Sequence, residues 1–156
     1  MQFSISSADL KEQLQIISGA ISSNPILPIL EDFLFKIEGS VLTISATDNQ
    51  TFMTSSIPVE SDEDGSVAIP AKILLDTLRQ LPTQPIKFSI DLDSFAVSVT
   101  SQFGQYKLAG EDGNDFPRIP TPDNVDSIEI PSPVLLEGIN KDNLSINNFE
   151  IIEVLM

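Results

Sequence analysis

The sequence predicts an α+β domain that consists of two β-α-β-β-β halves, with two helices packed on a curved antiparallel sheet. The first observation is a strand-then-helix unit that occurs twice, at residues 3–17 and 67–81, a separation of 64 residues. The second observation is that each unit is followed by segments in which apolar and polar residues alternate, with turn residues between them. Such alternation is typical of strands that bury one face.

The two copies of the unit agree residue by residue. A shift of 64 places five apolar residues of the first copy on five of the second: Phe3, Ile5, Leu10, Leu14 and Ile17 on Val67, Ile69, Leu74, Leu78 and Leu81. Steps of four and three place the helical residues on one apolar stripe, and a step of two places the strand residues on one sheet face. We therefore expect two neighbouring helices, over 8–17 and 71–81, that share one core and turn their polar sides outward together.

The segments between the helices predict the remaining strands. Residues 22–28 form a loop, because Pro25 and Pro28 exclude a helix there. Residues 33–37 and 41–46 predict a hairpin, and a strand over 52–59 ends in the acidic loop 61–65. The second half repeats this order, with a proline at the start of its helix and with strands expected at 66–69, 86–90, 95–99 and 105–109.

The pattern changes after the second half. Residues 110–122 are rich in Gly, Asp, Asn and Pro and predict a linker. A strand over 127–130 and a helix that starts at Val134 repeat the opening of a half without the strands that would complete it. We therefore divide the chain into a domain over 1–122, the incomplete start of a second domain over 123–141, and a tail over 142–156.

The composition excludes several classes of function. The chain of 156 residues has no cysteine, which excludes disulfide scaffolds and thiolate metal sites and fits a reducing cytoplasm. It has no histidine, so the usual general base and the Ser-His and Cys-His pairs are missing. No glycine spacing matches a nucleotide-binding loop, and we expect no signal peptide and no membrane span. We assign no catalytic residue, no metal ligand and no cofactor.

The net charge of −15 argues against a nucleic-acid partner on its face, because phosphate binding needs Lys and Arg. The distribution of charge is more informative than the sum. Three of the eight basic residues lie in the two repeated helices, where three acidic residues balance them, while the rest of the chain is strongly acidic. These helices are therefore less acidic than the remainder.

Two further interpretations concern single acidic sites. The run 62–65 suggests a calcium loop, but its glycine comes fourth instead of sixth and a strand follows directly, which favours a solvated turn. Asp48 suggests one member of a hydrolase carboxylate pair. Nothing in the sequence marks its partner, and aspartate is common in a turn at a strand end.

The chain resembles the N-terminal domain of the bacterial DNA polymerase III beta subunit, the sliding clamp family. Six short motifs carry this resemblance, and they occur in the family's order and at the family's spacing. They are Ser18-Gly19, Pro25-Ile26-Leu27-Pro28-Ile29-Leu30, Ala46-Thr47-Asp48, Ile69-Pro70-Ala71-Lys72, Leu81-Pro82 and Asp115-Phe116-Pro117. The resemblance starts at Met1 and extends to about Lys141, and residues 142–156 match nothing in the family that the motifs identify.

The resemblance implies a DNA-clamp domain within a processivity factor that catalyses nothing. A clamp subunit has three such domains, and two subunits close into a ring around duplex DNA, whose backbone the helices meet without sequence specificity. Such loose electrostatic contact permits sliding. The family's partners are DNA polymerase III and the clamp loader. This chain would then be a fragment that lacks most of the second domain and all of the third.

The resemblance also implies DNA-facing residues. Lys11, Lys72 and Arg79 match the helices that line the hole, and Asn24 takes a loop position where many members have an arginine. The alternative for the three basic residues is that they are ordinary solvated charges on amphipathic helices.

A second group of residues matches the edge that meets the partner subunit of the ring: Thr77, Leu81, Tyr106 and Leu108. The alternative for Tyr106 and Leu108 is an ordinary half-buried strand. A different function also stays open, an acidic protein-interaction module that no longer binds DNA, which the net charge and the incomplete second domain favour.

Overall fold

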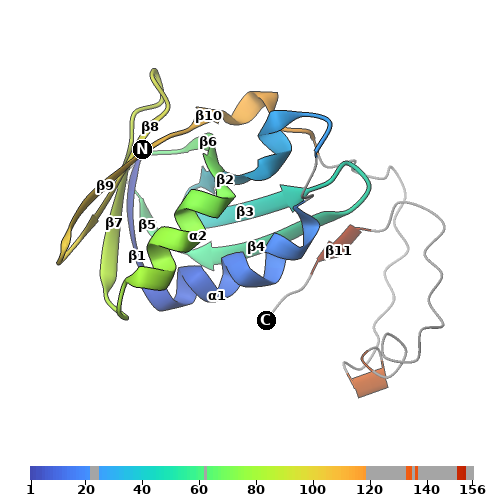
Figure 1. The fold of residues 1–156 in the computed structure, drawn as a ribbon, viewed down its shortest axis with the longest axis horizontal. Coiled ribbons are helices and arrows are strands. Elements are labelled where there is room, and N and C mark those ends of the chain that lie inside the picture. Colours follow the sequence, from blue (N-terminus) through green and yellow to red (C-terminus); the bar gives the residue numbers. More distant parts are fainter. Residues whose placement is uncertain (22–24, 62, 119–132, 135, 137–150, 154–156) are drawn as a thin grey trace.

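The structure, a computed structural model, describes residues 1–21, 25–61, 63–118, 133–134, 136 and 151–153. Two helices, α1 (Ser7–Ile17) and α2 (Ala71–Gln80), lie side by side against the strands (Figure 1). Several predicted segments lie outside the described residues: the strand over 127–130, the helix that starts at Val134 except for Val134 and Leu136, and the tail except for 151–153.

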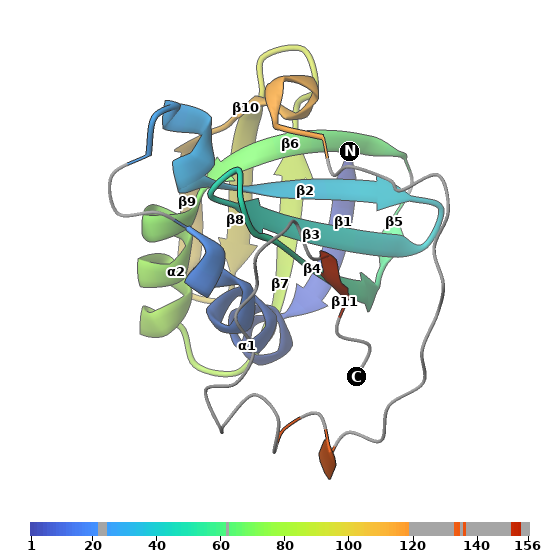
Figure 2. The ribbon, with the colours of Figure 1, turned by 90° about the vertical axis from the view of Figure 1, so that its right-hand side faces the viewer.

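The described strands form two sheets. The five-stranded sheet has the order β5-β1-β7-β8-β9, and the six-stranded sheet has the order β10-β6-β2-β3-β4-β11 (Figure 2). The strands of the first sheet are β1 (Gln2–Ser6), β5 (Glu60–Ser61), β7 (Pro85–Ile90), β8 (Ala96–Ser101) and β9 (Gly104–Ala109). Those of the second are β2 (Asp32–Glu38), β3 (Val41–Thr47), β4 (Phe52–Pro58), β6 (Gly65–Pro70), β10 (Glu111–Asp112) and β11 (Ile151–Glu153).

The two halves exchange their first strands. β1 of the first half pairs with β7 of the second, with Phe3 opposite Phe88, and β6 of the second half pairs with β2 of the first, with Phe35 opposite Val67. All described pairs are antiparallel except β11 with β4. The fold class is confirmed, and the curved surface that the sequence predicts is divided into these two sheets.

The halves differ mainly in the connection that follows each helix. The first half uses residues 18–31, which include the short 3-10 helices η1 (Ser18–Ala20) and η2 (Pro28–Glu31), whereas the second uses only residues 81–84. The 64-residue spacing therefore holds for the opening strand and helix but falls to 53 for the strands that follow, since Phe35 corresponds to Phe88.

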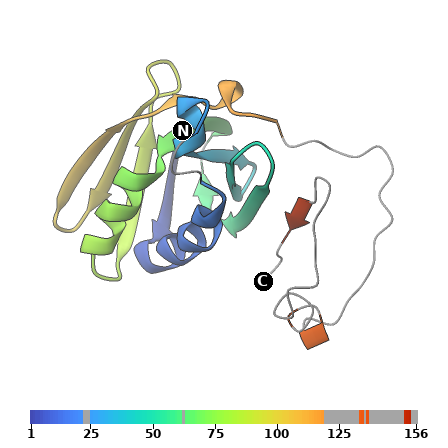
Figure 3. The same ribbon diagram turned by 45° about the vertical axis from the view of Figure 1, so that its right-hand side comes forward.

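One core joins the helices to both sheets. Leu10, Leu14, Leu74 and Leu78 are each at most 1% exposed and belong to a single cluster, as the repeat predicts. Contacts of α1 reach β1, β3 and β4, and those of α2 reach β2 and β6. Figure 3 shows the pair of helices with the strands behind them.

Three phenylalanines fill the centre of this core. The rings of Phe3 and Phe88 stack with centroids 4.8 Å apart, and Phe35 packs against both at 6.4 and 6.0 Å. These rings come from the two exchanged pairings, so the aromatic centre joins the halves.

The predicted linker over 110–122 is wrong for its first part. Residues 111–112 form β10, and η3 (Gly113–Asp115) and Phe116 follow it across the six-stranded sheet. The glycines are required for close packing: a Cβ at Gly113 would lie 2.6 Å from Ser66 Oγ, and one at Gly110 would lie 2.8 Å from the carbonyl oxygen of Ala68. Residues 119–122 lie outside the described part.

Candidate nucleic-acid interface

The outer side of the helix pair carries the basic residues that the sequence singles out. Lys72 and Arg79 on α2 are exposed, and Lys11 on α1 is half-buried. The leucines of both helices point inward to the core, so the polar sides face outward together as the repeat predicts. We define Lys11, Lys72 and Arg79 as the basic helix face.

The positive charge of this face is weak. Arg79 Nη1 lies 2.9 Å from Asp76 Oδ1, an ion pair within α2. Among the described residues, Lys11 and Lys72 have no ion-pair partner. Asp9 lies in the first turn of α1, which has no basic residue in its last turn. Within the described part of the chain, Lys11 and Lys72 are therefore available to a polyanion, whereas Arg79 would first have to break its ion pair with Asp76.

Buried and partly buried hydrogen bonds fix the start of α1 to the segment that follows α2. Ser7 Oγ donates to the Pro82 carbonyl oxygen at 2.9 Å and accepts from the Gln84 backbone N–H at 3.0 Å. The Ser7 N–H donates to the Gln84 carbonyl oxygen at 2.9 Å. Gln84 Oε1 in turn accepts the Gln102 N–H at 2.8 Å. These bonds hold the relative position of the two helices, and they stabilise it because each polar group is removed from water with a partner.

Sequence reasoning missed this pair of positioning residues. Ser7 and Gln84 are only 2% and 5% exposed. A serine at the start of a helix and a glutamine in a loop look like ordinary surface residues, and only their partners, 75 or more positions away, give them a role. A similar contact, Ser55 Oγ donating to Gln13 Oε1 at 2.6 Å, ties α1 to β4.

The residues matched to the partner edge lie in different environments. Leu81 and Leu108 are buried in the core, at 7% and 9% exposure, and Tyr106 is partly buried against it. Thr77 is half-buried, and its hydroxyl donates to the carbonyl oxygen of Ile73 at 2.8 Å in the same helix. β9 is the edge strand of its sheet, so a partner would meet its backbone and the ring of Tyr106 before the two leucines.

Asn24 lies outside the described residues. The structure therefore brings Lys11, Lys72 and Arg79 onto one helix pair and leaves the fourth expected DNA contact without a position.

Two carboxyl groups have shifted pKa values, and neither belongs to the basic helix face. Burial raises the pKa of Asp32 to about 7, with further contributions from the negative charges of Glu111 and Glu31. The hydroxyl of Ser94, which donates to Asp91 Oδ2 at 2.6 Å, lowers the pKa of Asp91.

The described residues hold no cluster of three or more metal-ligating side chains. In the same part, none of the helices is long and apolar enough to cross a membrane.

Residues 1–120 match the family model described as the DNA polymerase III beta subunit, N-terminal domain. The beta sliding clamp of Vibrio harveyi is 38% identical over 120 residues, which cover 76% of this chain and 82% of that sequence. The beta sliding clamp of Synechocystis sp. is 32% identical over 139 residues, 85% of this chain but 36% of that protein. The chain thus spans well under half of the latter relative.

A third relative extends the similarity further along the chain. The beta sliding clamp of Vibrio cholerae is 30% identical over 152 residues, which cover 97% of this chain and 41% of that protein. Such an alignment includes part of the tail over 142–156.

Solved structures agree on the fold. The Caulobacter crescentus pol III beta structure superposes with a TM-score of 0.82 at 25% identity and covers 90% of this chain and 38% of that one. The sliding clamp from Bacillus subtilis superposes with a TM-score of 0.81 at 22% identity and covers 86% of this chain and 37% of that one.

Proposed function

Since the chain belongs to the family of the DNA polymerase III beta subunit, we propose that it serves as the first domain of a sliding clamp, a non-catalytic processivity factor that encircles duplex DNA. DNA polymerase III and the clamp loader are its proposed partners, and the bacterial cytoplasm is its proposed location. A ring of the kind that the family forms would also require the second and third domains of the clamp subunit.

The observation that supports DNA contact is the basic helix face. Two helices side by side present a few long basic side chains on one outer side of the domain. Such a surface suits backbone phosphates, and it carries no sequence information. A contact of this kind lets a duplex slide, whereas base-edge hydrogen bonds would hold it in place.

The structure limits the affinity that we expect from this domain alone. Each neutralised phosphate contributes about −0.9 to the slope of log K against log salt, so three basic residues would give about −2.7. Because Arg79 is paired with Asp76, the two lysines alone give about −1.8. On a chain of charge −15 we expect binding near the weak end of the non-specific range, about 10⁻⁴ M or weaker.

Fluorescence anisotropy with two unrelated duplexes at two salt concentrations tests this proposal. We expect equal, weak, salt-dependent binding to both, and loss of that binding when Lys11 and Lys72 are changed to Glu. The matched control changes Lys87 and Lys107, which are exposed on the five-stranded sheet, to Glu. It alters the net charge equally. Equal loss in the control, or strong preference for one duplex, would contradict the proposed surface.

The net charge favours one second candidate, an acidic protein-interaction module that does not bind DNA. The same experiment separates the two. The module predicts no saturable binding at the lower salt concentration and no effect of the Lys11 and Lys72 changes.

For the association of subunits, we propose the edge strand β9 and the neighbouring end of α2 as the contact surface, with Tyr106 and Thr77 as its accessible side chains. Unpaired edge strands recruit other chains unless charge or a cover prevents it. Leu81 and Leu108 would then support this surface from the core.

A further inference from the structure

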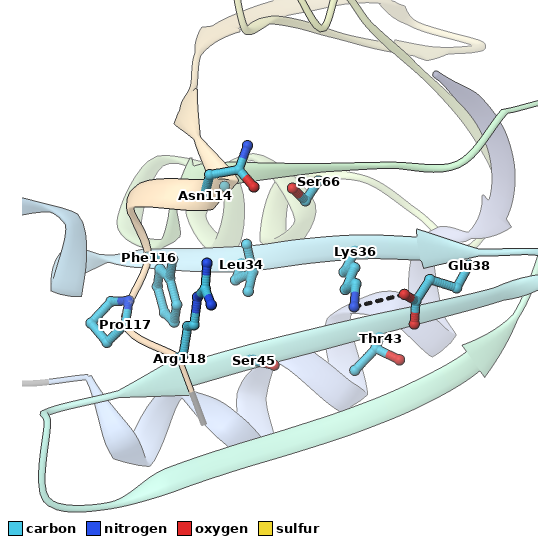
Figure 4. A pocket seen from close by; sticks show the side chains of 11 residues that line it. Leu34, Lys36, Glu38, Thr43, Ser45, Ser66, Asn114, Phe116, Pro117 and Arg118 are labelled. Atoms are coloured by element: carbon cyan, nitrogen blue, oxygen red, sulfur yellow. Dashed lines mark ion pairs between the residues drawn. The ribbon is translucent and has the colours of Figure 1, made fainter. Parts of the chain in front are cut away.

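A recess of about 400 Å³ lies on the face of the six-stranded sheet that points away from the helices. Its floor consists of β6, β2 and β3, where Leu34, Lys36 and Thr43 face outward. Its wall is the segment 113–118 that follows β10 (Figure 4). We call it the outer recess, and it shares no residue with the basic helix face.

The wall of the outer recess is firmly seated. Phe116 is only 4% exposed and packs in one cluster with Ile29 and Ala68, against which Leu34 also lies. Gly113 touches Ser66 so closely that a Cβ would lie 2.6 Å from its hydroxyl oxygen. Packing therefore holds the wall of the recess in place before any ligand binds, which lowers the entropic cost of binding.

The charge of the recess differs from that of the rest of the molecule. It contains Lys36 and Arg118, two of only eight basic residues in a chain of net charge −15. Lys36 Nζ lies 2.7 Å from Glu38 Oε1, while Arg118 is exposed and forms no ion pair with the described residues. Figure 4 shows Arg118 extending beside Phe116 and Leu34.

We propose that the outer recess binds an acidic peptide segment that combines one carboxylate with an apolar side chain. The guanidinium of Arg118, which forms no ion pair with another described residue, can hold a carboxylate by two parallel hydrogen bonds. Leu34 and Pro117 supply the apolar surface, and the side chains of Thr43 and Asn114 can bond to peptide groups.

Two features favour a peptide over a nucleic acid. Glu38 lies at the recess beside Lys36, and its charge repels a polyanion more strongly than a ligand with a single negative charge. Phe116, the aromatic ring of the wall, is buried and so offers no open face on which a base could stack.

The test is an NMR titration of the ¹⁵N-labelled full chain with N-acetyl-leucyl-aspartate methylamide and, separately, with the uncharged leucyl-asparagine analogue. We expect saturable shifts of the backbone amides of Lys36, Ser45, Ser66 and Asn114 with the aspartate peptide, in the millimolar range. The asparagine peptide should bind about tenfold more weakly, which is the loss expected for one charge-assisted hydrogen bond.

Arg118→Gln should weaken the binding of the aspartate peptide by a similar factor. Lys87→Gln, which makes the same charge change on the other sheet, should leave that binding unchanged. Gly113→Ala should also weaken binding with all charges retained, because it displaces the wall. Shifts without saturation, equal binding of the two peptides, or equal effects of Arg118→Gln and Lys87→Gln would overturn the proposal. A short duplex that shifts these amides where the peptide does not would also overturn it.

Discussion

A single buried carboxyl group is expected to set part of the pH dependence of this domain. Asp32 is the first residue of β2, pairs with Pro70 of β6, and is 6% exposed. The negative charges of Glu31 and Glu111 lie close enough to add to the effect of burial, and together they raise the pKa of Asp32 from 3.8 to about 7. The change that isolates this group is Asp32→Asn, which keeps the shape of the side chain and removes its charge.

The direction of the pH dependence of the free energy of unfolding follows from proton binding. Because the folded pKa lies above the unfolded one, the folded chain holds a proton on Asp32 between pH 3.8 and about 7, whereas the unfolded chain does not. The free energy of unfolding therefore falls as pH rises through this window. A rise of the pKa from 3.8 to about 7 corresponds to an upper limit of about 4 kcal/mol. Relaxation and water entry around the charge reduce this, and we expect a loss of about 2 kcal/mol.

Urea denaturation of wild type and Asp32→Asn at pH 4 and pH 8 measures this effect, because pH 4 lies at the lower end of the window and pH 8 above it. The variant should match wild type within about 0.5 kcal/mol at pH 4 and exceed it by about 2 kcal/mol at pH 8. Glu12→Gln, at an exposed position of α1, should keep the wild-type pH dependence. The reasoning would be refuted if the difference between Asp32→Asn and wild type were the same at both pH values.

Two further predictions concern the core and the edge strand. Leu14→Ala and Leu78→Ala, at 0% and 1% exposure, should each lower the free energy of unfolding by about 2–5 kcal/mol. Ile73→Ala, at 53% exposure on α2, should change it by less than about 1 kcal/mol, and equal urea midpoints for all three would contradict the assigned core. Sedimentation over a wide concentration range should show weak self-association through β9 that Tyr106→Asp removes. Val41→Asp, at an exposed position of the other sheet, should leave that association intact, and a strict monomer at high concentration would argue against the β9 surface.

The sequence predicts the helices and the long strands well because their signals are local. The predicted helices over 8–17 and 71–81 differ from α1 and α2 by one residue at one end. Apolar periodicity carries this information, since it records which face of each element meets the core. The two-residue strands β5 and β10 are too short for any alternation, and the sequence does not predict them.

The candidate interface is predicted less completely, for physical reasons that differ between residues. The outward position of Lys72 and Arg79 follows from helical periodicity. Asp76 and Arg79 are three residues apart in one helix, so the sequence contains the spacing that brings them into an ion pair. The burial of Leu108 depends on which face of β9 meets the core, and the roles of Ser7 and Gln84 depend on contacts between segments that are distant in the chain.

The exchange of first strands explains why a duplicated sequence gives one domain instead of two. β1 lies between β5 and β7, and β6 lies between β10 and β2, so each half supplies an interior strand to the sheet of the other. Removal of β1 would leave β7 without its neighbour and expose Phe88, and removal of β6 would do the same to β2 and Phe35. A half that cannot cover its own apolar face is not stable alone. The two helices are therefore held side by side by the same pairings that complete the sheets, and the position of the basic helix face is a consequence of the exchange.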